Sequence, residues 1–330
     1  MASDPSADRG AARPGQSRSG SYAAIGRCQL MGRYLSGVVL LVLLITACVP
    51  AAPAVPQAEV SAGYARPELL AETDWLAANL SNPNLRVVDL RPLEAYQAAH
   101  IPGAVWLDVR KLDDPQTQYV PGPEDFARLM GGLGVDNETL VVSYDDQGGL
   151  RAARLWWALD YYGHSRTKVL NGGWNKWVKE GRPVSHEVPQ VQPAVFVPRV
   201  NEGSMCRLDY LKEALNRPGV VILDARSPAE YNGTDVRAKR GGHIPGAVNI
   251  DWQLAISPDD LKVFKPAAEL RRLFEAAGVT PDKEVITYCQ TGVRSAHTLF
   301  VLRLLGYNRV RNYDGSWAEW GNNPELPIER

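Results

Sequence analysis

The chain contains two copies of one sequence pattern. Residues 85–91 read LRVVDLR and residues 220–226 read VVILDAR, so Asp89 and Asp224 lie 135 residues apart. The turn HIPGAV begins at residue 100 and again 143 residues later, at residue 243. The offset of 143 then holds for the matching pairs Arg151/Arg294, Gly163/Gly306, Trp174/Trp317 and Trp177/Trp320. A period this long indicates a duplicated domain rather than a solenoid. The change of offset places an insertion in the second copy, between Tyr231 and His243.

Within each copy, short apolar segments alternate with helical ones. Three strands are expected in each copy, at 87–90, 140–144 and 168–170 and at 220–224, 284–288 and 309–312. Amphipathic helices are expected over 151–162 and 294–305, each followed by a glycine that can cap it. This alternation predicts an α/β fold in which each copy forms a parallel sheet with helices on both faces. Ligand sites in such sheets form at the carboxyl ends of the strands.

The length and composition suit two ordinary globular domains. The chain has 330 residues, of which 45% are hydrophobic and 22% charged. We expect the first copy at 64–188, a linker at 189–203 and the second copy at 204–330. The formal net charge of −1 gives no indication of a nucleic-acid partner, and we expect the protein to be a monomer.

The residues before the first copy have the composition of a leader. Residues 1–30 are rich in Gly, Ser, Ala and Arg without an apolar period, which indicates a disordered segment or a mis-assigned start. Residues 31–48 have the pattern of a signal peptide, because Arg33 precedes an apolar run too short to span a bilayer and small residues precede Cys48. Residues 49–63 are rich in Pro and Ala, which suits an extended tether.

The sequence around Cys48 resembles the lipobox of bacterial lipoproteins, in which the cysteine becomes the lipidated first residue. The resemblance implies a lipoprotein of the cell envelope, anchored to a membrane with its globular part outside the cytoplasm. An ordinary signal peptide or a membrane anchor is the alternative.

The cysteines of the chain do not have the spacing of a metal-binding site or of a disulfide framework. The chain has four, Cys28, Cys48, Cys206 and Cys289, with no C-x-x-C spacing. A structural metal site and a disulfide framework are therefore not expected. Cys206 lacks a loop of special composition and is expected to be an inert thiol.

Cys289 stands where a thiolate can be stabilised. A β-branched apolar run ends at this cysteine, and a small polar loop and an amphipathic helix follow it. A thiol with an ordinary pKa near 8.5 becomes more acidic beside cations and helix N-termini. Gly292 can adopt a positive φ and turn the backbone N–H groups inward, and Arg294 adds a positive charge. We therefore expect the loop residues to bind the substrate: Gln290, Thr291, Gly292, Val293 and Arg294. The alternative is a buried, unreactive cysteine.

The first copy lacks the nucleophile. Where the second copy has Cys289, the first has Asp145, in a loop that is one residue longer. The first copy is therefore expected to be non-catalytic and to supply a scaffold and one wall of the site.

Three motifs give the chain a resemblance to a known family. They are Tyr96-x3-HIPGA-x2-Leu107 in the first copy, YDGSWAEW at residues 313–320, and the loop that begins at Cys289. Together they cover about residues 65–328 and resemble the two-domain rhodaneses, which are thiosulfate sulfurtransferases. The resemblance implies tandem rhodanese-like domains, of which the second is catalytic.

The resemblance also implies a mechanism without a cofactor. Cys289 would attack the outer sulfur of thiosulfate, release sulfite, and pass the sulfur from a persulfide to cyanide, a thiol or a protein. Two-domain sulfurtransferases bind the anionic donor through basic residues near the insertion, which makes Arg237, Lys239 and Arg240 candidates for donor binding; a solvated surface loop is the alternative.

Asp224 and Arg226 are expected to orient loops, because the pair recurs in the first copy.

The resemblance favours thiosulfate over 3-mercaptopyruvate as donor, although relatives carry an arginine where this chain has Glu230. A phosphatase group shares the fold but needs Cys-x5-Arg, one residue more than separates Cys289 from Arg294. A membrane-anchored sulfur relay or binding protein remains the third alternative.

Overall fold

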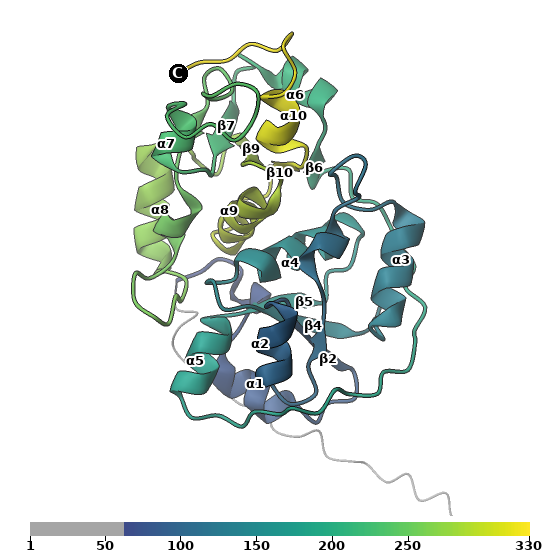
Figure 1. Ribbon diagram of the computed structural model, residues 1–330. Coiled ribbons are helices and arrows are strands. Elements are labelled where there is room, and N and C mark those ends of the chain that lie inside the picture. The colour runs from purple at the N-terminus through teal and green to yellow at the C-terminus, as the bar shows by residue number, and fades with distance from the viewer. Residues whose placement is uncertain (1–62) are drawn as a thin grey trace, which may run out of the picture. The chain divides into compact units, whose positions relative to one another are not determined.

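The computed structural model describes residues 63–330 of the chain. Within this part, each copy forms a five-stranded sheet in which all paired strands are parallel. The order of the strands is β1-β5-β4-β2-β3 in the first copy and β6-β10-β9-β7-β8 in the second (Figure 1). The two orders are equivalent, as duplication requires. The predicted α/β fold, with one parallel sheet in each copy, is confirmed.

The first-copy strands are β1 (Leu70–Ala71), β2 (Leu85–Asp89), β3 (Val105–Trp106), β4 (Leu140–Tyr144) and β5 (Thr167–Leu170). The second-copy strands are β6 (Met205–Cys206), β7 (Val220–Asp224), β8 (Val248–Asn249), β9 (Glu284–Tyr288) and β10 (Val310–Tyr313). The sequence pattern predicts the longer strands to within two residues at either end. It misses β1, β3, β6 and β8, because two residues are too few to show alternation.

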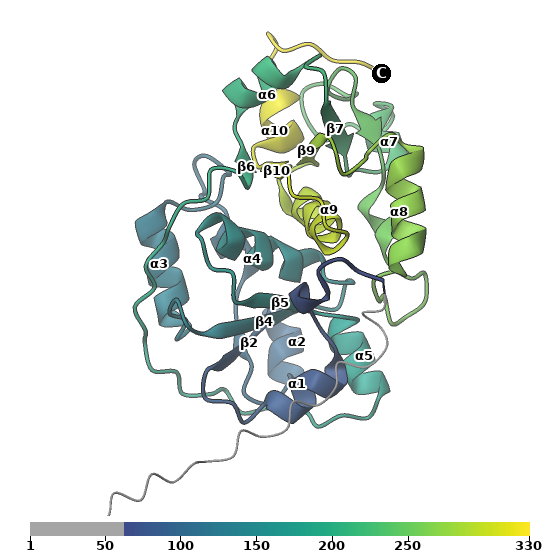
Figure 2. The same ribbon diagram turned by 180° about the vertical axis from the view of Figure 1, so that it is seen from behind.

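The first-copy helices are α1 (Thr73–Asn79), α2 (Leu93–Ala98), α3 (Pro123–Gly132), α4 (Leu150–Tyr161) and α5 (Gly173–Lys179), with 3-10 turns η1 (Pro67–Leu69) and η2 (Val109–Leu112). Those of the second copy are α6 (Leu208–Ala214), α7 (Pro228–Tyr231), α8 (Ala267–Ala276), α9 (Val293–Leu304) and α10 (Ser316–Trp320), with the 3-10 turn η3 (Trp252–Ala255). In the first copy, α1, α2 and α5 lie on one face of the sheet and α4 lies on the other (Figures 1 and 2).

The two faces of each sheet belong to different hydrophobic cores. Successive strand residues point to opposite faces, so Val87 of β2 joins a small core with α1 and α5, whereas Val88 joins a large one. In the second copy, Ile286 of β9 joins a smaller core, whereas its neighbour Val285 joins the large one. The large core contains residues of both copies and includes the buried faces of α4 and α9, which pack against each other. One continuous core therefore joins the two domains.

Each copy also extends a loop onto the other. From the first copy, the N–H of Val120 donates to Asp314 at 2.7 Å and the Tyr119 hydroxyl donates to Glu319 at 2.6 Å. From the second, the N–H of Phe264 donates to the side chain of Asn171 at 3.0 Å. Each copy thus contacts the residue that follows the last strand of the other, Asp314 after β10 and Asn171 after β5.

The leader, the proposed start at residue 31, Cys48 and all of the tether but its last residue lie outside the described residues. Among residues 63–330, no helix combines the length and the hydropathy needed to cross a bilayer.

Candidate functional site

Cys289 lies at the carboxyl end of β9, near the middle of the second sheet. The preceding residues Val285 to Tyr288 are buried, which fixes the end of the strand. Gly292 then adopts a φ of +80° as the N-cap of α9 and turns the chain into the helix. The thiol is free and its residue is only 1% exposed.

The surroundings of Cys289 favour its thiolate. Burial alone raises the pKa of the thiol. The charge of Arg294, the Ser295 hydroxyl at 3.5 Å from the sulfur, and the N–H groups of Ser295 and Thr291 outweigh burial, and the pKa lies below its ordinary value. The site therefore favours the anionic form of this buried sulfur, mainly through one cation and through hydrogen bonds.

The corresponding loop of the first copy shows what such a loop binds. The Asp145 side chain is buried, and its carboxylate accepts hydrogen bonds from four backbone N–H groups. The donors are Gln147 at 2.7 Å, Gly149 at 3.0 Å, Arg151 at 2.6 Å and Ala152 at 2.9 Å. A side-chain anion thus fills this loop, which therefore holds neither a nucleophile nor space for an anionic substrate among these donors.

Ser316 supports the Cys289 loop and is missed by the sequence reasoning. Its hydroxyl accepts hydrogen bonds from the N–H groups of Cys289 and Gly292, both at 3.1 Å, and donates to the carbonyl of Tyr313 at 2.8 Å. The residue has a φ of +51°, which is strained for a side chain other than glycine. Its counterpart in the first copy is Gly173, with a φ of +49°. The serine–glycine difference at the constant offset of 143 was the available signal.

Ser316→Gly is expected to preserve the fold and to lower the reactivity of Cys289. Glycine relieves the positive φ, as Gly173 does in the first copy, but the loop loses the hydroxyl that holds two of its N–H groups. We expect the pKa of Cys289 to rise and its alkylation at neutral pH to slow about fivefold, the effect of one hydrogen bond of about 1 kcal/mol.

The measurement is iodoacetamide alkylation of Cys289 against pH, beside the thermal unfolding midpoint. The matched control is Gly173→Ser, whose added Cβ would collide with the Asp145 carbonyl oxygen, so that it lowers stability and leaves the pH profile of Cys289 in place. An unchanged profile in Ser316→Gly would contradict the positioning role.

Arg294 is paired with a buried carboxylate. Its two terminal nitrogens donate to the two oxygens of Glu230 at 2.6 and 2.8 Å. Glu230, on α7, is 1% exposed. Burial alone would raise its pKa, but the hydrogen bonds and charge of Arg294, with smaller contributions from Ser227 and Arg237, lower it to about 2. The pair is therefore ionised throughout the physiological range.

The basic residues of the insertion occupy three different environments. Arg237 is 55% exposed and pairs with Asp235, and its carbonyl accepts a hydrogen bond from the Gln290 side chain at 3.0 Å. Lys239 is exposed. Arg240 instead donates to four backbone carbonyls at and after the end of α10, those of Trp320, Gly321, Asn323 and Leu326. The structure therefore brings Arg237 to the loop and uses the guanidinium of Arg240 to hold the C-terminal segment.

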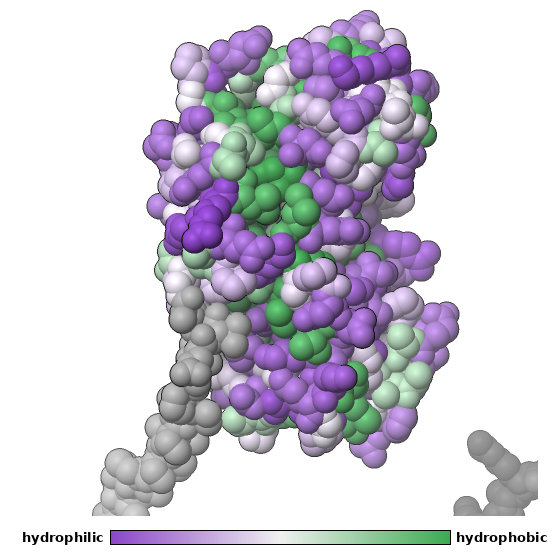
Figure 3. Space-filling view, turned by 90° about the vertical axis from the view of Figure 1, so that its left-hand side faces the viewer, coloured by the Kyte–Doolittle hydropathy of each residue, from purple (hydrophilic) through white to green (hydrophobic). Residues whose placement is uncertain are grey.

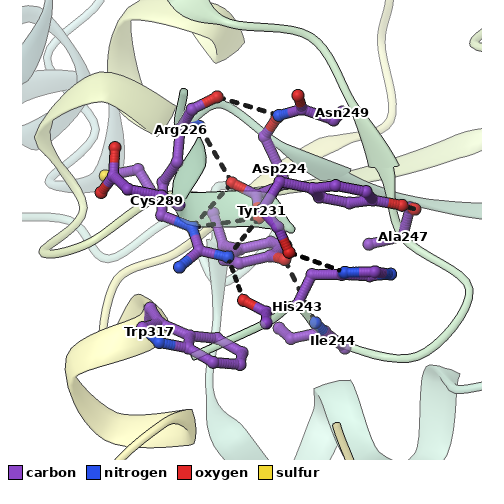
Figure 4. Close-up of polar contacts among 12 residues, drawn as sticks. Asp224, Arg226, Tyr231, His243, Ile244, Ala247, Asn249, Cys289 and Trp317 are labelled. Carbon is purple, nitrogen blue, oxygen red and sulfur yellow. Dashed lines mark hydrogen bonds and ion pairs between the residues drawn. The ribbon is translucent and has the colours of Figure 1, made fainter. Parts of the chain in front are cut away.

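Asp224 and Arg226 form a buried ion pair beside the site. The guanidinium donates to both oxygens of Asp224, at 2.6 Å for the closest contact, and lies 4.5 Å from the centre of the Trp317 ring (Figure 4). Asp224 is the register partner of Tyr288, the residue that precedes Cys289. The first copy repeats the arrangement with Asp89 and Arg91, although it has no nucleophile. The recurrence favours an orienting role for the pair.

Arg154 of the first copy anchors the other side of the loop. This fully buried arginine, on α4, pairs with Asp314 of the second copy and with Asp113 of its own copy, at 2.8 Å in the latter case. A Cβ on Gly292 would lie 3.1 Å from Arg154, and so the guanidinium borders the Cys289 loop. The first copy thus supplies one wall of the site.

A cleft of about 670 Å³ lies between the copies. Its lining includes Gln147 of the first copy and Trp252, Leu254 and Ile256 of the second. The Trp252 ring lies 5.1 Å from that of His297, so the cleft borders α9. Cys289 is not part of the lining. One face of the molecule also carries a band of hydrophobic residues between hydrophilic ones (Figure 3).

Comparison with known families gives two matches along the chain. The rhodanese-like domain matches residues 72–180 and residues 207–323. Both matches fall within the two sheet-forming copies.

Several curated proteins are similar over most of their length. The sulfur carrier protein TtuD of Thermus thermophilus is 42% identical over 283 residues, which cover 81% of this chain and 99% of the relative. A thiosulfate sulfurtransferase of Corynebacterium glutamicum is 41% identical and covers 81% of this chain and 92% of its own. A thiosulfate sulfurtransferase of Azotobacter vinelandii is 40% identical, and the match covers 81% of this chain and 98% of the relative.

Solved structures of EanB are also similar. The wild-type structure has a TM-score of 0.75 at 27% identity and covers 80% of this chain and 69% of its own. The anaerobic ergothioneine biosynthesis enzyme of Chlorobium limicola, in complex with trimethyl histidine, has a TM-score of 0.75 at 26% identity. This match covers 80% of this chain and 71% of the enzyme's chain.

Proposed function

Since this chain belongs to the rhodanese-like family and carries the domain twice, we propose that it is a thiosulfate sulfurtransferase of the thiosulfate:cyanide type. The observation that carries the proposal is the buried thiol of Cys289, whose pKa is lowered inside a loop of inward-facing N–H groups. Relatives of about 40% identity that bear the name thiosulfate sulfurtransferase support the choice of donor.

The reaction proceeds in two nucleophilic steps. The Cys289 thiolate attacks the outer sulfur of thiosulfate, a new S–S bond forms, and the S–S bond of thiosulfate breaks as sulfite leaves with the bonding electron pair. An acceptor such as cyanide then attacks the outer sulfur of the persulfide, and the Cys289 thiolate leaves. Each step exchanges one anionic sulfur species for another, which the same loop can stabilise. The scheme is covalent and ping-pong.

The charged groups have separate tasks in this scheme. Arg294 and the N–H groups of the loop stabilise the thiolate before the first step and after the second, and they offer the same charge and donors to the anionic persulfide between the steps. Arg237, whose carbonyl meets the loop and whose guanidinium pairs with Asp235, and the exposed Lys239 are the insertion residues that would attract an anionic donor through their positive charge. Arg240 is left out of donor binding because its side-chain nitrogens already bind backbone carbonyls.

The decisive experiment compares thiosulfate with 3-mercaptopyruvate as donors, each with cyanide as acceptor. We expect faster thiocyanate formation from thiosulfate. Intact-mass analysis after thiosulfate alone should show an adduct of about +32 Da, one sulfur atom, on Cys289. Faster turnover of 3-mercaptopyruvate would assign the alternative donor, and absence of the adduct with both donors would reject a sulfurtransferase.

A sulfur relay is the second candidate. It is favoured by the similarity to a protein named as a sulfur carrier. In a relay, the persulfide would pass to a thiol or a protein instead of cyanide. Single-turnover discharge of the preformed persulfide by cyanide, by a small dithiol and by a protein thiol distinguishes the two functions.

We also propose that the protein is a lipoprotein anchored at Cys48, because residues 31–48 have the pattern of a lipoprotein signal. Cys48→Ser is expected to move the protein from the membrane fraction of a bacterial host to the soluble or unprocessed fraction. Cys206→Ser, at a free cysteine outside the leader, is the control and should leave the protein membrane-bound. Fractionation and mass analysis of the N-terminal peptide check both, and an unmodified Cys48 in the wild type would reject the anchor.

A further inference from the structure

Glu230 occupies an unusual place for an acidic residue beside an anion-stabilising loop. It ends the capping box of α7, in which the Ser227 hydroxyl accepts from the Glu230 N–H at 3.2 Å and the carboxylate accepts from the Ser227 N–H at 3.2 Å. The same carboxylate binds both terminal nitrogens of Arg294 and lies 3.8 Å from Arg237. A buried negative charge therefore contacts the loop's own arginine.

The bidentate contact determines what Arg294 can do. A guanidinium that donates both terminal nitrogens to one carboxylate has its end-on fork occupied and its orientation fixed, so that only the side fork at Nε remains for another anion. Its charge still acts on Cys289, because Coulomb attraction requires no hydrogen bond. The hydrogen bonds inside the loop are then left to backbone N–H groups and to the Ser295 hydroxyl.

The two copies provide an internal comparison. At the constant offset of 135, the counterpart of Glu230 is Ala95, which has no carboxylate. The counterpart of Arg294 is Arg151, which meets Asp146 of its own loop through a single contact at 3.3 Å. The buried clamp on the loop arginine is thus confined to the copy that has the cysteine.

We propose that Glu230 is a specificity-determining residue that holds Arg294 away from the interior of the loop, so that the interior accepts a single sulfur atom, such as the outer sulfur of thiosulfate, and excludes the oxygens of oxyanions. Thiolate and terminal persulfide present one charged atom, which N–H groups can surround. Sulfite, sulfate and phosphate present several oxygens and bind best to a planar fork such as a free arginine. The sulfite product would therefore leave without being retained. The inference rests on the proposed function for its substrate, but not for its test.

The test is protection of Cys289 from alkylation by inorganic phosphate and by sulfite, which needs no turnover. Glu230→Gln keeps the side-chain volume and a capping-box residue while it removes the charge. In the wild type we expect neither anion to slow alkylation at millimolar concentration. In Glu230→Gln we expect apparent affinity for both to rise at least about tenfold, the effect of one released charge-assisted hydrogen bond.

Two further variants decide how the effect arises. Glu230→Gln combined with Arg294→Gln should lose the gained protection, because the anion would bind through the released guanidinium. Asp146→Asn, which releases Arg151 in the first copy, is the matched control and should not change protection of Cys289. Circular dichroism and the unfolding midpoint establish that each variant is folded. In Glu230→Asp, which keeps the charge, phosphate and sulfite should not protect Cys289 from alkylation.

The outcomes separate this inference from the proposed function. Protection in Glu230→Gln that disappears in the double variant supports the role of Glu230 whether or not thiosulfate is the donor. Equal protection in folded Glu230→Gln and wild type, or protection that survives Arg294→Gln, overturns it. A wild type that forms no persulfide from thiosulfate would reject the proposed donor and leave the anion measurements interpretable.

Discussion

Replacing Cys289 with serine is expected to reduce thiocyanate formation from thiosulfate and cyanide by at least about 1,000-fold, as removal of a covalent nucleophile does in other enzymes. The loop lowers the pKa of a thiol, but a serine hydroxyl remains protonated in the same surroundings. A serine also forms no persulfide, so the ping-pong route is lost entirely.

Initial rates of thiocyanate formation and intact-mass analysis after thiosulfate measure the effect. Cys206→Ala provides the matched control, because Cys206 is also a free, buried thiol, but burial raises its pKa to about 12 and it lies outside the loop. It should keep wild-type activity. Substantial thiocyanate formation by folded Cys289→Ser would reject the central assignment.

Replacing Arg154 with leucine is expected to lower the free energy of unfolding by about 3–5 kcal/mol, the range for breaking a fully buried ion pair. The arginine is wholly inaccessible and its main partner, Asp314, is too. Without the guanidinium, the Asp314 carboxylate still accepts a hydrogen bond from the N–H of Val120, at 2.7 Å, but it no longer has a positive charge beside it. Because the pair borders Gly292, we also expect slower alkylation of Cys289.

Urea denaturation measures the loss of stability. Arg110→Leu is the control, since Arg110 forms an ion pair with Asp108 on the surface, and its loss should leave the midpoint unchanged. The double variant Arg154→Leu/Asp314→Leu should recover part of the stability, because it removes the uncompensated charge. Equal midpoints for Arg154→Leu and wild type would show that the pair does not stabilise the domain interface.

Much of the fold follows from local sequence patterns. Strands β4, β7 and β9 begin and end where their apolar runs do, and the helices after β4 and β9 begin within one residue of the expected position. These elements are long enough to show periodicity, and the duplication confirms each one with a second example. The position of Cys289 at a strand end follows from the same reasoning.

The supporting contacts of the site do not follow from local patterns. Glu230 and Arg294 are 64 residues apart, and their contact depends on where α7 lies against the loop. Arg240 is basic and belongs to the insertion, which favours donor binding from sequence alone, yet carbonyl groups at and after the end of α10 bind its guanidinium. Ser316 has a role only because β10 ends behind the loop. In each case the partner comes from a distant segment, and composition carries no information about it.

The large core that includes α4 and α9 has a consequence for the evolution of the protein. Either copy alone would expose the apolar face of its long helix to water, so neither half is an independently stable module. The first copy has Asp145 where the second copy has its nucleophile, but the shared core still requires the first copy to remain folded. The first domain therefore persists as an obligatory folding partner, and the two halves are expected to unfold in a single cooperative transition.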